Sequence, residues 1–215
     1  MKTVLITAFE PFGGEICNAS WEAAKVFHQR EIAGARVIVC QLSCAFDLAL
    51  QQLYRAVTQW QPEAVIAVGE AGGRADISIE RVAININDAR IADNQGNQPI
   101  DTPVIEGGPA AYFSTLSVKA LVSALRGANI PASVSQTAGT FVCNHLMYGL
   151  LHLLHQQGDV VRGGFVHVPY SPQQAVGHPG EPCMPTSTVS DALEIIIGQS
   201  LLVRQDMPVA GGALH

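Results

Sequence analysis

Cys143 is the residue that the sequence pattern places best for nucleophilic chemistry. It follows a strand-like run and an Ala-Gly-Thr turn, and it opens a long apolar segment with helical spacing. Free backbone N–H groups and the positive end of the dipole at a helix start favour a thiolate, and they can also stabilise an oxyanion. A cysteine in an apolar protein is more often an inert buried side chain. The local pattern therefore leaves both interpretations open.

A cysteine nucleophile needs a base, and the chain contains seven histidines. His145 follows Cys143 by two residues, so on a helix it would point to a different side. His167 differs from the others because it falls near the end of the strand-like run GGFVHVPY. Ligands of open α/β sheets bind beyond the carboxyl ends of the strands, and we expect Cys143 to emerge at that same edge. The sequence therefore favours His167 as the base.

Glu80 is the candidate for the group that orients this base. It lies in the alternating apolar run DISIERVAINI, where a carboxylate needs a compensating partner. One interpretation is an ion pair with Arg81 or Arg90. The other is that Glu80 holds the imidazole of His167 and stabilises its protonated form, as the acidic member of a triad does. From the pattern alone the two are equally open.

Other chemistries have weaker support in the sequence. The glycines of FGGE and GEAGGR fit neither a dinucleotide-binding nor a P-loop pattern, and no H-E-x-x-H or C-x-x-C spacing predicts a metal site. Phe9 and Phe12, on the turn after the first strand, serve either as lids on the core or as walls of an apolar pocket for a flat ligand.

These residues must be positioned by an alternation of strands and helices. Strand-like runs of β-branched residues alternate with segments of helical spacing. We expect strands at 2–9, 35–42, 63–70, 76–86, 131–137 and 163–170, and helices at 18–30, 46–60, 112–130, 143–157 and 188–204. Asn18 is expected to cap the first helix, and Thr188 with Asp191 to form a capping box at the last. Residues 87–109 show no sustained period and are expected to form a long loop, functional or mobile.

The alternation predicts a single-domain α/β fold, a three-layer α/β/α sandwich with a largely parallel, mixed central sheet. We expect residues 1–205 to form one domain and residues 206–215 a flexible tail. The chain has 215 residues, of which 48% are hydrophobic, and its net charge is −6. Its few Lys and Arg residues are scattered, which argues against nucleic-acid and acidic-membrane partners.

The N-terminus and the cysteines favour a cytoplasmic protein. The first apolar run is short and ends at Phe-Glu-Pro, so it predicts a strand rather than a signal peptide, and no run reaches transmembrane length. The five cysteines form no regular framework, which indicates a reducing compartment.

Long segments of the chain resemble the pyroglutamyl peptidase I family of cysteine peptidases. ITAFEPFGGEICNASW is similar to the N-terminal block of that family, GEAGGRADISIERVAININDARIADNQG to its glutamate block, SVSQTAGTFVCNHLMYG to its cysteine block and GFVHVPY to its histidine segment. The resemblance implies a triad of Cys143, His167 and Glu80, with His167 keeping Cys143 as a thiolate. It also implies release of N-terminal pyroglutamate from peptides through a thioester, without a metal or an organic cofactor.

The resemblance also implies a set of substrate contacts. Arg90 matches an arginine that lies near the nucleophile and supports the oxyanion, and the backbone at Glu70 would bind the lactam N–H and C=O. The family usually has Gln or another neutral residue at position 70, so we expect a negative side chain beside the pocket to alter affinity or pH response. The implied pocket around the lactam ring is formed by Phe9, Phe12, Phe141 and Val142.

Two other functions stay open at the level of sequence. One is a cysteine amidohydrolase with a different acyl preference, which Glu70 supports, and the other is a non-catalytic α/β protein that binds a metabolite at the glycine-rich edge. For the main interpretation, the partners are peptides with an N-terminal pyroglutamate and further copies of the chain, as a dimer or tetramer. Loop 87–109 either covers the site or lies in a subunit interface.

Overall fold

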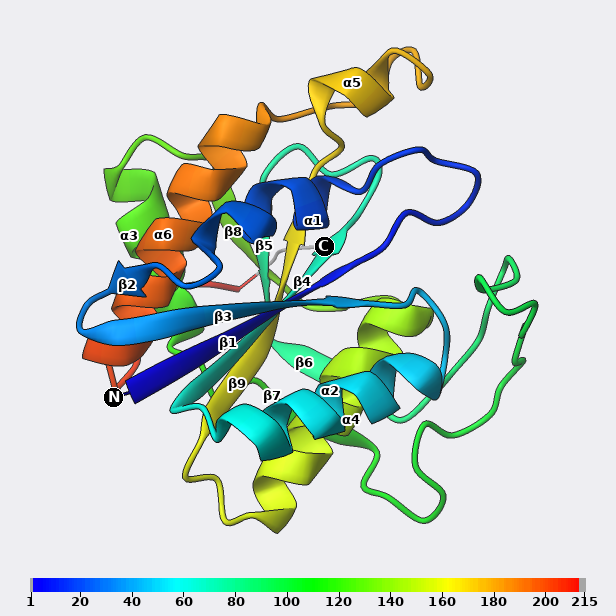
Figure 1. Cartoon of the computed structure of the whole chain (residues 1–215), viewed down its shortest axis with the longest axis horizontal. Coiled ribbons are helices and arrows are strands. Elements are labelled where there is room, and N and C mark those ends of the chain that lie inside the picture. Colours follow the sequence, from blue (N-terminus) through cyan, green and yellow to red (C-terminus); the bar gives the residue numbers. More distant parts are fainter. Residues whose placement is uncertain (1, 213–215) are drawn as a thin grey trace.

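A seven-stranded sheet forms the centre of the protein (Figure 1). The structure is a computed structural model and describes residues 2–212. The strand order is β2-β3-β1-β4-β9-β5-β8, with bounds Glu31–Ile32, Ala35–Leu42, Lys2–Phe9, Ala64–Glu70, Arg162–Val168, Ile77–Glu80 and Ala132–Ser135. The last strand in the sequence, β9, therefore lies inside the sheet, between β4 and β5.

The sheet has two blocks of opposite direction. Strands β3, β1, β4 and β9 run parallel to one another, with the short β2 antiparallel at the edge. Strand β5 pairs antiparallel with β9 and parallel with β8. The predicted sheet, mixed and largely parallel, is confirmed, and the reversal falls at the β9–β5 pair.

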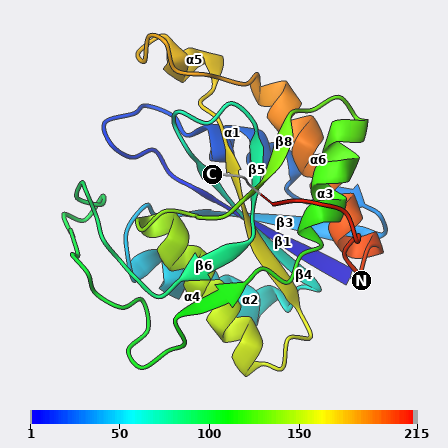
Figure 2. The same ribbon diagram turned by 180° about the vertical axis from the view of Figure 1, so that it is seen from behind.

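Helices cover both faces of the sheet, which confirms the predicted three layers (Figures 1 and 2). Side chains alternate along each strand, so Val4 and Ile6 of β1 pack on one face while Leu5 and Phe9 pack on the other. None of the helices in the described part of the chain is long and apolar enough to cross a membrane. One face carries α1 (Ala19–Ala24), α3 (Val118–Gly127) and α6 (Thr186–Leu202), and the other carries α2 (Leu48–Trp60) and α4 (Val142–Gln156).

A second, two-stranded sheet lies beside α4. Strands β6 (Val82–Ile84) and β7 (Ala111–Phe113) pair antiparallel, and the long loop between them projects from the body of the molecule in Figure 1. The loop contains no helix or strand apart from an isolated bridge between Asn87 and Thr102. The predicted loop 87–109 is confirmed.

Three predicted elements were wrong in extent. The run 76–86 is not one strand, because the chain leaves the main sheet at Arg81 and continues as β6 in the second sheet. The apolar alternation continues through the break, so the period alone does not reveal it. The predicted helix 112–130 begins only at Val118, after β7 and a turn. The first helix is also shorter than expected: α1 is followed by a 3-10 turn, η1 (Lys25–Phe27).

The helix caps were predicted with mixed success. Asn18 caps α1 by accepting a hydrogen bond from the backbone N–H of Ser20, as expected. Thr188 and Asp191 do not form a capping box, because α6 already begins at Thr186 and both residues lie inside it. A capping box is present instead at the short α5 (Pro172–Ala175), between Ser171 and Gln174.

The segment that follows α6 contacts the body of the molecule. The carboxylate of Asp206 accepts hydrogen bonds from the backbone N–H groups of Lys119 and Ala120, in the first turn of α3. The carbonyl of Gly211 accepts one from Arg81 Nη2 at 2.8 Å. The flexibility expected for 206–215 stays a prediction, and its last residues, 213–215, lie outside the described residues.

Candidate active site

A buried imidazole–carboxylate pair lies in the middle of the sheet. His167 Nδ1 and Glu80 Oε1 are 2.7 Å apart, and the two side chains are 4% and 0% exposed. The antiparallel register produces this contact. Ser78 lies opposite His167, and Glu80 follows Ser78 by two residues, so it lies on the same face of β5 and diagonally across from His167. With Nδ1–H donated to the carboxylate, Nε2 is left to accept a proton.

Cys143 reaches the same place from α4. It is the second residue of that helix, and a Cβ added to Gly69 would lie 3.0 Å from its sulfur. Gly69 is the register partner of His167 on the neighbouring strand β4. The structure therefore brings Cys143, His167 and Glu80 together on the α4 face of the sheet, as predicted.

The path of the chain to Cys143 differs from the expected one. Ser133 in β8 and His167 in β9 are both register partners of Ser78, so the start of β8 is level with His167. The end of α4 packs against the start of β9, so α4 runs in the same direction as β8. Residues 136–141 must therefore run back along the sheet before the helix begins. The expected sharp elbow, with Cys143 and His167 both at the carboxyl ends of their strands, is wrong because β8 and β9 are antiparallel.

Burial sets the protonation of the thiol and the imidazole. Burial raises the pKa of Cys143 well above its ordinary value, helped by Cys44 and Glu80 and opposed by Arg74. Burial lowers the pKa of His167, although the hydrogen bond and charge of Glu80 act in the opposite direction. Both directions favour a neutral thiol–imidazole pair at rest rather than the standing thiolate expected from the sequence.

The start of α4 supplies hydrogen-bond donors beside the thiol. Phe141 is the N-cap, with extended backbone angles (φ −96°, ψ −161°) and no capping side chain. The first backbone N–H groups of a helix have no partners within the helix, so those of Val142, Cys143 and Asn144 are available to an anionic oxygen.

Aromatic rings surround the residue that precedes this helix. The ring of Phe141 lies 6.3 Å from that of Phe12 and 5.3 Å from that of Phe46, which meets it edge to face. Phe12 and Phe141 are half-buried, so their faces are partly open. The predicted pair is therefore brought together, and Phe46 is a third member that the sequence analysis missed.

Phe9 and Val142, the other two predicted pocket residues, are buried in the core. The ring of Phe9 lies 6.4 Å from that of Phe165, which in turn lies 4.8 Å from the ring of His167. Val142 is fully buried at the start of α4. These two side chains pack in the core next to the site. Their direct contact with a ligand stays a prediction.

His145 supports the aromatic group from behind. Its Nδ1–H donates to Asn87 Oδ1 at 3.0 Å, its Nε2 accepts from the backbone N–H of Asp47 at 3.1 Å, and its ring meets Phe46 edge to face. Burial lowers the pKa of His145 to about 4, so the imidazole is neutral. The sequence analysis set His145 aside correctly as a base but missed this role.

Glu70 points away from the thiol. Its register partner is Val168, and both side chains lie on the α1 face, opposite to His167. The Glu70 carboxylate accepts a 2.6 Å hydrogen bond from the backbone N–H of Ala19, and burial raises its pKa. The Glu70 side chain was expected beside the pocket, and it lies on the face of the sheet opposite to His167. Its effect on affinity or pH response, and substrate binding by the backbone at this position, stay predictions.

The ion pair of Glu80 involves neither of the predicted arginines. Arg74, in the turn after β4, donates from Nη1 to Glu80 Oε1 at 2.6 Å. Arg81 instead contacts Gln136 and Gly211, and Arg90 is exposed on the long loop. The role of Arg90 at the oxyanion stays a prediction. Arg74 is the last residue of GEAGGR, and nothing in the pattern around it indicates a contact with Glu80.

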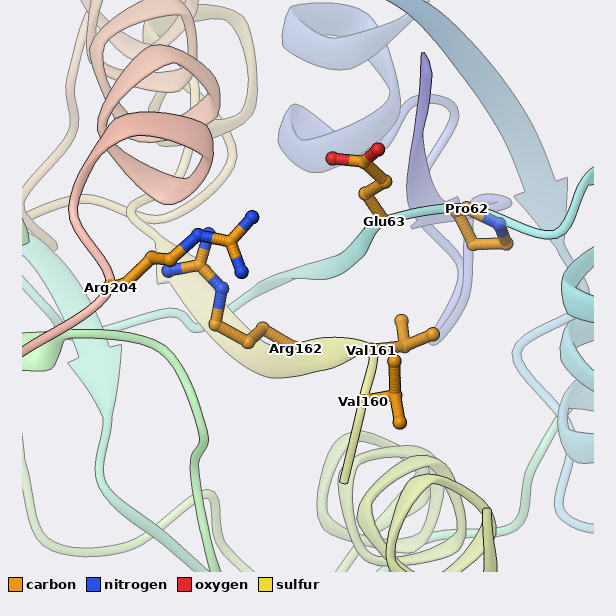
Figure 3. A pocket seen from close by; sticks show the side chains of 6 residues that line it. All are labelled: Pro62, Glu63, Val160, Val161, Arg162 and Arg204. Atoms are coloured by element: carbon orange, nitrogen blue, oxygen red, sulfur yellow. The ribbon is translucent and has the colours of Figure 1, made fainter. Parts of the chain in front are cut away.

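The hollow drawn in Figure 3 is at the other end of the sheet. Its volume is about 270 Å³, and Arg162, at the start of β9, lines it. His167 is five residues further along that strand, which corresponds to roughly 16 Å. The full lining is Pro62, Glu63, Val160, Val161, Arg162 and Arg204.

Within residues 2–212, no group of three or more His, Cys, Asp or Glu side chains is arranged to hold a metal ion.

Comparison with known proteins gives one consistent result. A family model described as pyroglutamyl peptidase matches residues 2–202. The chain is 76% identical over 215 residues, the full length of both proteins, to a pyrrolidone-carboxylate peptidase of Pectobacterium carotovorum. It is 60% identical over 215 residues, again at full length, to the protein of the same name from Klebsiella pneumoniae.

Solved structures give the same result for the fold. The crystal structure of pyroglutamyl peptidase I from Bacillus amyloliquefaciens aligns with a TM-score of 0.95 at 42% identity, over 97% of this chain and 99% of that one. The pyrrolidone carboxyl peptidase of Thermococcus litoralis aligns with a TM-score of 0.92 at 39% identity, over 98% and 100% of the two chains.

Proposed function

Because this chain belongs to the pyroglutamyl peptidase family, we propose that Cys143 is its nucleophile, His167 its general base and acid, and Glu80 the group that orients His167. The chain is a cysteine-type peptidase, a hydrolase that removes an N-terminal pyroglutamyl residue from peptides. The main support for these roles is the buried 2.7 Å contact between His167 Nδ1 and Glu80 Oε1. Cys143 Sγ lies over Gly69, the register partner of His167 on the neighbouring strand.

The first half of the reaction forms a thioester. Nε2 of His167 accepts the thiol proton as Cys143 Sγ attacks the pyroglutamyl carbonyl. Backbone N–H groups at the start of α4 hold the oxyanion, and Arg90 is the proposed additional cation. His167 then gives its proton to the leaving amine as the C–N bond breaks. Glu80 stabilises the imidazolium between these two transfers.

The second half releases pyroglutamate. His167 Nε2 takes a proton from water, the water oxygen attacks the thioester carbonyl, and the C–S bond breaks. The departing sulfur takes the proton back from the imidazolium, which restores the neutral pair that burial favours. No metal or organic cofactor takes part in either half.

The lactam ring is proposed to bind against the aromatic group at the start of α4. A five-membered lactam is flat and has no charged amine, so an apolar wall with few hydrogen bonds suits it. The half-buried faces of Phe12 and Phe141 support this position, with the backbone at Glu70 as the proposed partner of the lactam N–H and C=O. Phe9 and Val142 form the proposed floor.

The test of this function is cleavage of reporter amides. Wild-type protein should cleave a pyroglutamyl amide and leave prolyl and glutaminyl amides intact, while Cys143→Ser, Cys143→Ala and thiol alkylation should abolish turnover and chelators should not. Cys183→Ser is the matched control, because Cys183 is an exposed free thiol whose loss should leave turnover unchanged. Full turnover by the alkylated protein would exclude the thiol mechanism. Preference for another acyl group would favour the amidohydrolase, and cleavage of no reporter would favour a binding protein.

We also propose that the protein acts in the cytoplasm as a dimer or tetramer. Five free cysteines suit a reducing compartment. Exposed apolar side chains such as Ile16, Phe113 and Val176 are candidates for burial between copies, which the molar mass in solution tests.

A further inference from the structure

Arg74 connects three parts of the chain that meet at the proposed triad. Its Nη1 donates to Glu80 Oε1 at 2.6 Å and to Ser135 Oγ at 3.3 Å, and its Nη2 donates to the carbonyl of Thr137 at 3.0 Å. Glu80 and Ser135 are register partners on β5 and β8, so their side chains lie on the same face. Thr137 belongs to the returning segment 136–141, which ends at the helix that carries Cys143.

The contacts around Arg74 close into a ring of hydrogen bonds. Ser135 Oγ donates to the carbonyl of Thr137 at 3.0 Å and accepts from the Thr137 backbone N–H at 3.3 Å. The guanidinium therefore binds a segment that is already folded on itself. A planar fork of five donors can satisfy Glu80, Ser135 and Thr137 together, whereas a lysine ammonium acts as a single point charge on a flexible stem.

Arg74 also binds the same carboxylate oxygen that His167 uses. Glu80 is fully buried and its Oε2 has no hydrogen-bond partner among residues 2–212, so Oε1 makes both charged contacts. The side chain of Arg74 is 26% exposed and closes the open side of this pair. Because Arg74 and His167 both bind Oε1, each contact helps to fix the position of this oxygen.

From this geometry, and resting on the proposed roles of Cys143, His167 and Glu80, we propose that Arg74 is a positioning residue of the reaction. It holds Glu80 Oε1 against the imidazole of His167, and through Thr137 it fixes the segment that leads into Cys143. Arg74 thereby links the orienting side of the triad to the nucleophile side, without contact with the reacting atoms.

The charge of Arg74 gives this role a signature that a purely structural residue lacks. The charged groups that act on His167 are Glu80 from β5, which raises its pKa, and Arg74, which lowers it. Burial, Cys44, Glu80 and Glu70 raise the pKa of the Cys143 thiol on α4, and Arg74 lowers it. Loss of the guanidinium should therefore move the pH dependence of the reaction and not only its rate.

The experiment compares Arg74→Met and Arg74→Lys with Arg81→Met. Arg81 is the matched control, because it lies beside Glu80 in the sequence and at the same end of β5 but contacts Gln136 and Gly211. The measurements are kcat and KM for a pyroglutamyl amide from acid to neutral pH, and the pH dependence of Cys143 alkylation by a neutral haloacetamide. Thermal melting confirms that each variant is folded.

Arg74→Met should lower kcat by roughly 10–100-fold with a smaller change in KM, and it should move the acid limb of kcat/KM to higher pH. Arg74→Lys should keep the acid limb of wild type, since the charge remains, while recovering only part of kcat. Arg81→Met should match wild type. The proposal would be overturned if Arg74→Met lowered kcat/KM by the same factor at every pH, or if Arg74→Met and Arg81→Met had the same kcat and the same pH profile.

The design separates this proposal from the proposed function. Failure of wild-type protein to cleave the pyroglutamyl amide would reject the function, while alkylation would still report the Arg74 effect on the thiol. If Arg74→Met does not fold, Arg74→Lys decides the question, because full kcat in that variant would contradict the need for the fork of donors.

Discussion

At the residue scale, the contact between His167 and Glu80 determines how pH acts on the protein. A carboxylate that is fully buried must be paired, and Glu80 pairs with both Arg74 and His167, the proposed base. The hydrogen bond and charge of Glu80 raise the pKa of His167, while the positive charge of Arg74 lowers it. The base is thereby kept available at neutral pH.

The acid limb of activity is the first consequence. Burial lowers the pKa of His167 from its ordinary value of 6.5, so the imidazole loses its basic form only below that pH. We expect kcat/KM of the wild type to fall as pH decreases through a midpoint below 6.5. Glu80→Gln removes the charge that raises this pKa, so the midpoint should move lower still while kcat drops. A pH–rate profile on both proteins checks the direction, and a midpoint that rises in Glu80→Gln would contradict it.

Residue types and strand positions singled out Cys143, His167 and Glu80 as candidates. They left open an inert thiol and an ion-paired carboxylate, and only the resemblance to a family favoured the triad, whose catalytic roles stay a prediction. Each has a chemistry that its sequence surroundings do not explain, such as a carboxylate in an apolar strand. Arg74, Phe46 and His145 were missed because each is ordinary in its own segment. Their roles arise only from contacts with residues far away in the chain, for which sequence patterns carry no signal.

At the element scale, α4 anchors the start of the long loop as well as carrying Cys143, the proposed nucleophile. Asn144 Oδ1 accepts from the backbone N–H of Ile84, and its Nδ2 donates to the carbonyls of Ile84 and Ile86. Tyr148, one turn further on, donates to the carbonyl of Pro109 at the other end of the loop. The helix thus joins the second sheet and both ends of the loop to the site.

Asn144→Ala should therefore destabilise the protein. Asn144 is buried, and the change removes its hydrogen bonds to the partly buried backbone of Ile84 and Ile86, which costs about 1–2 kcal/mol. Denaturant unfolding measures the loss. His155→Ala, on an exposed part of the same helix, is the control and should change the unfolding free energy by less than about 0.5 kcal/mol. Equal effects of the two changes would show that Asn144 is not an anchor.

At the scale of the whole molecule, periodicity predicted the layers but not the direction of the strands. The spacing of apolar residues is local, so it distinguished strands from helices and correctly gave one α/β domain. The reversal between β9 and β5 depends on how connections cross the sheet. The break at Arg81 has the same origin, since the alternating pattern is identical whether a strand stays in one sheet or enters another.

The segment beyond α6 contributes to stability at this same scale. Ser117, the N-cap of α3, makes no capping hydrogen bond of its own, and Asp206 supplies the acceptor from far along the chain. We expect Asp206→Ala to lower the unfolding free energy by about 1 kcal/mol, as loss of a helix cap does. Asp191→Ala is the control, because Asp191 lies inside α6 and should have little effect. Denaturant midpoints of both variants decide whether the residues after 205 stabilise the fold.

The place of β9 inside the sheet has a consequence for synthesis of the chain. Until the ribosome has released residue 168, β4 and β5 each present an open strand edge, and only β9 can close both. Such edges can pair with other chains, so the incomplete protein is exposed to aggregation between the synthesis of β5 and that of β9. His167 arrives with that same closing strand. A nascent chain of this protein therefore gains its base and loses its open edges in a single event, and no shorter intermediate has a complete site.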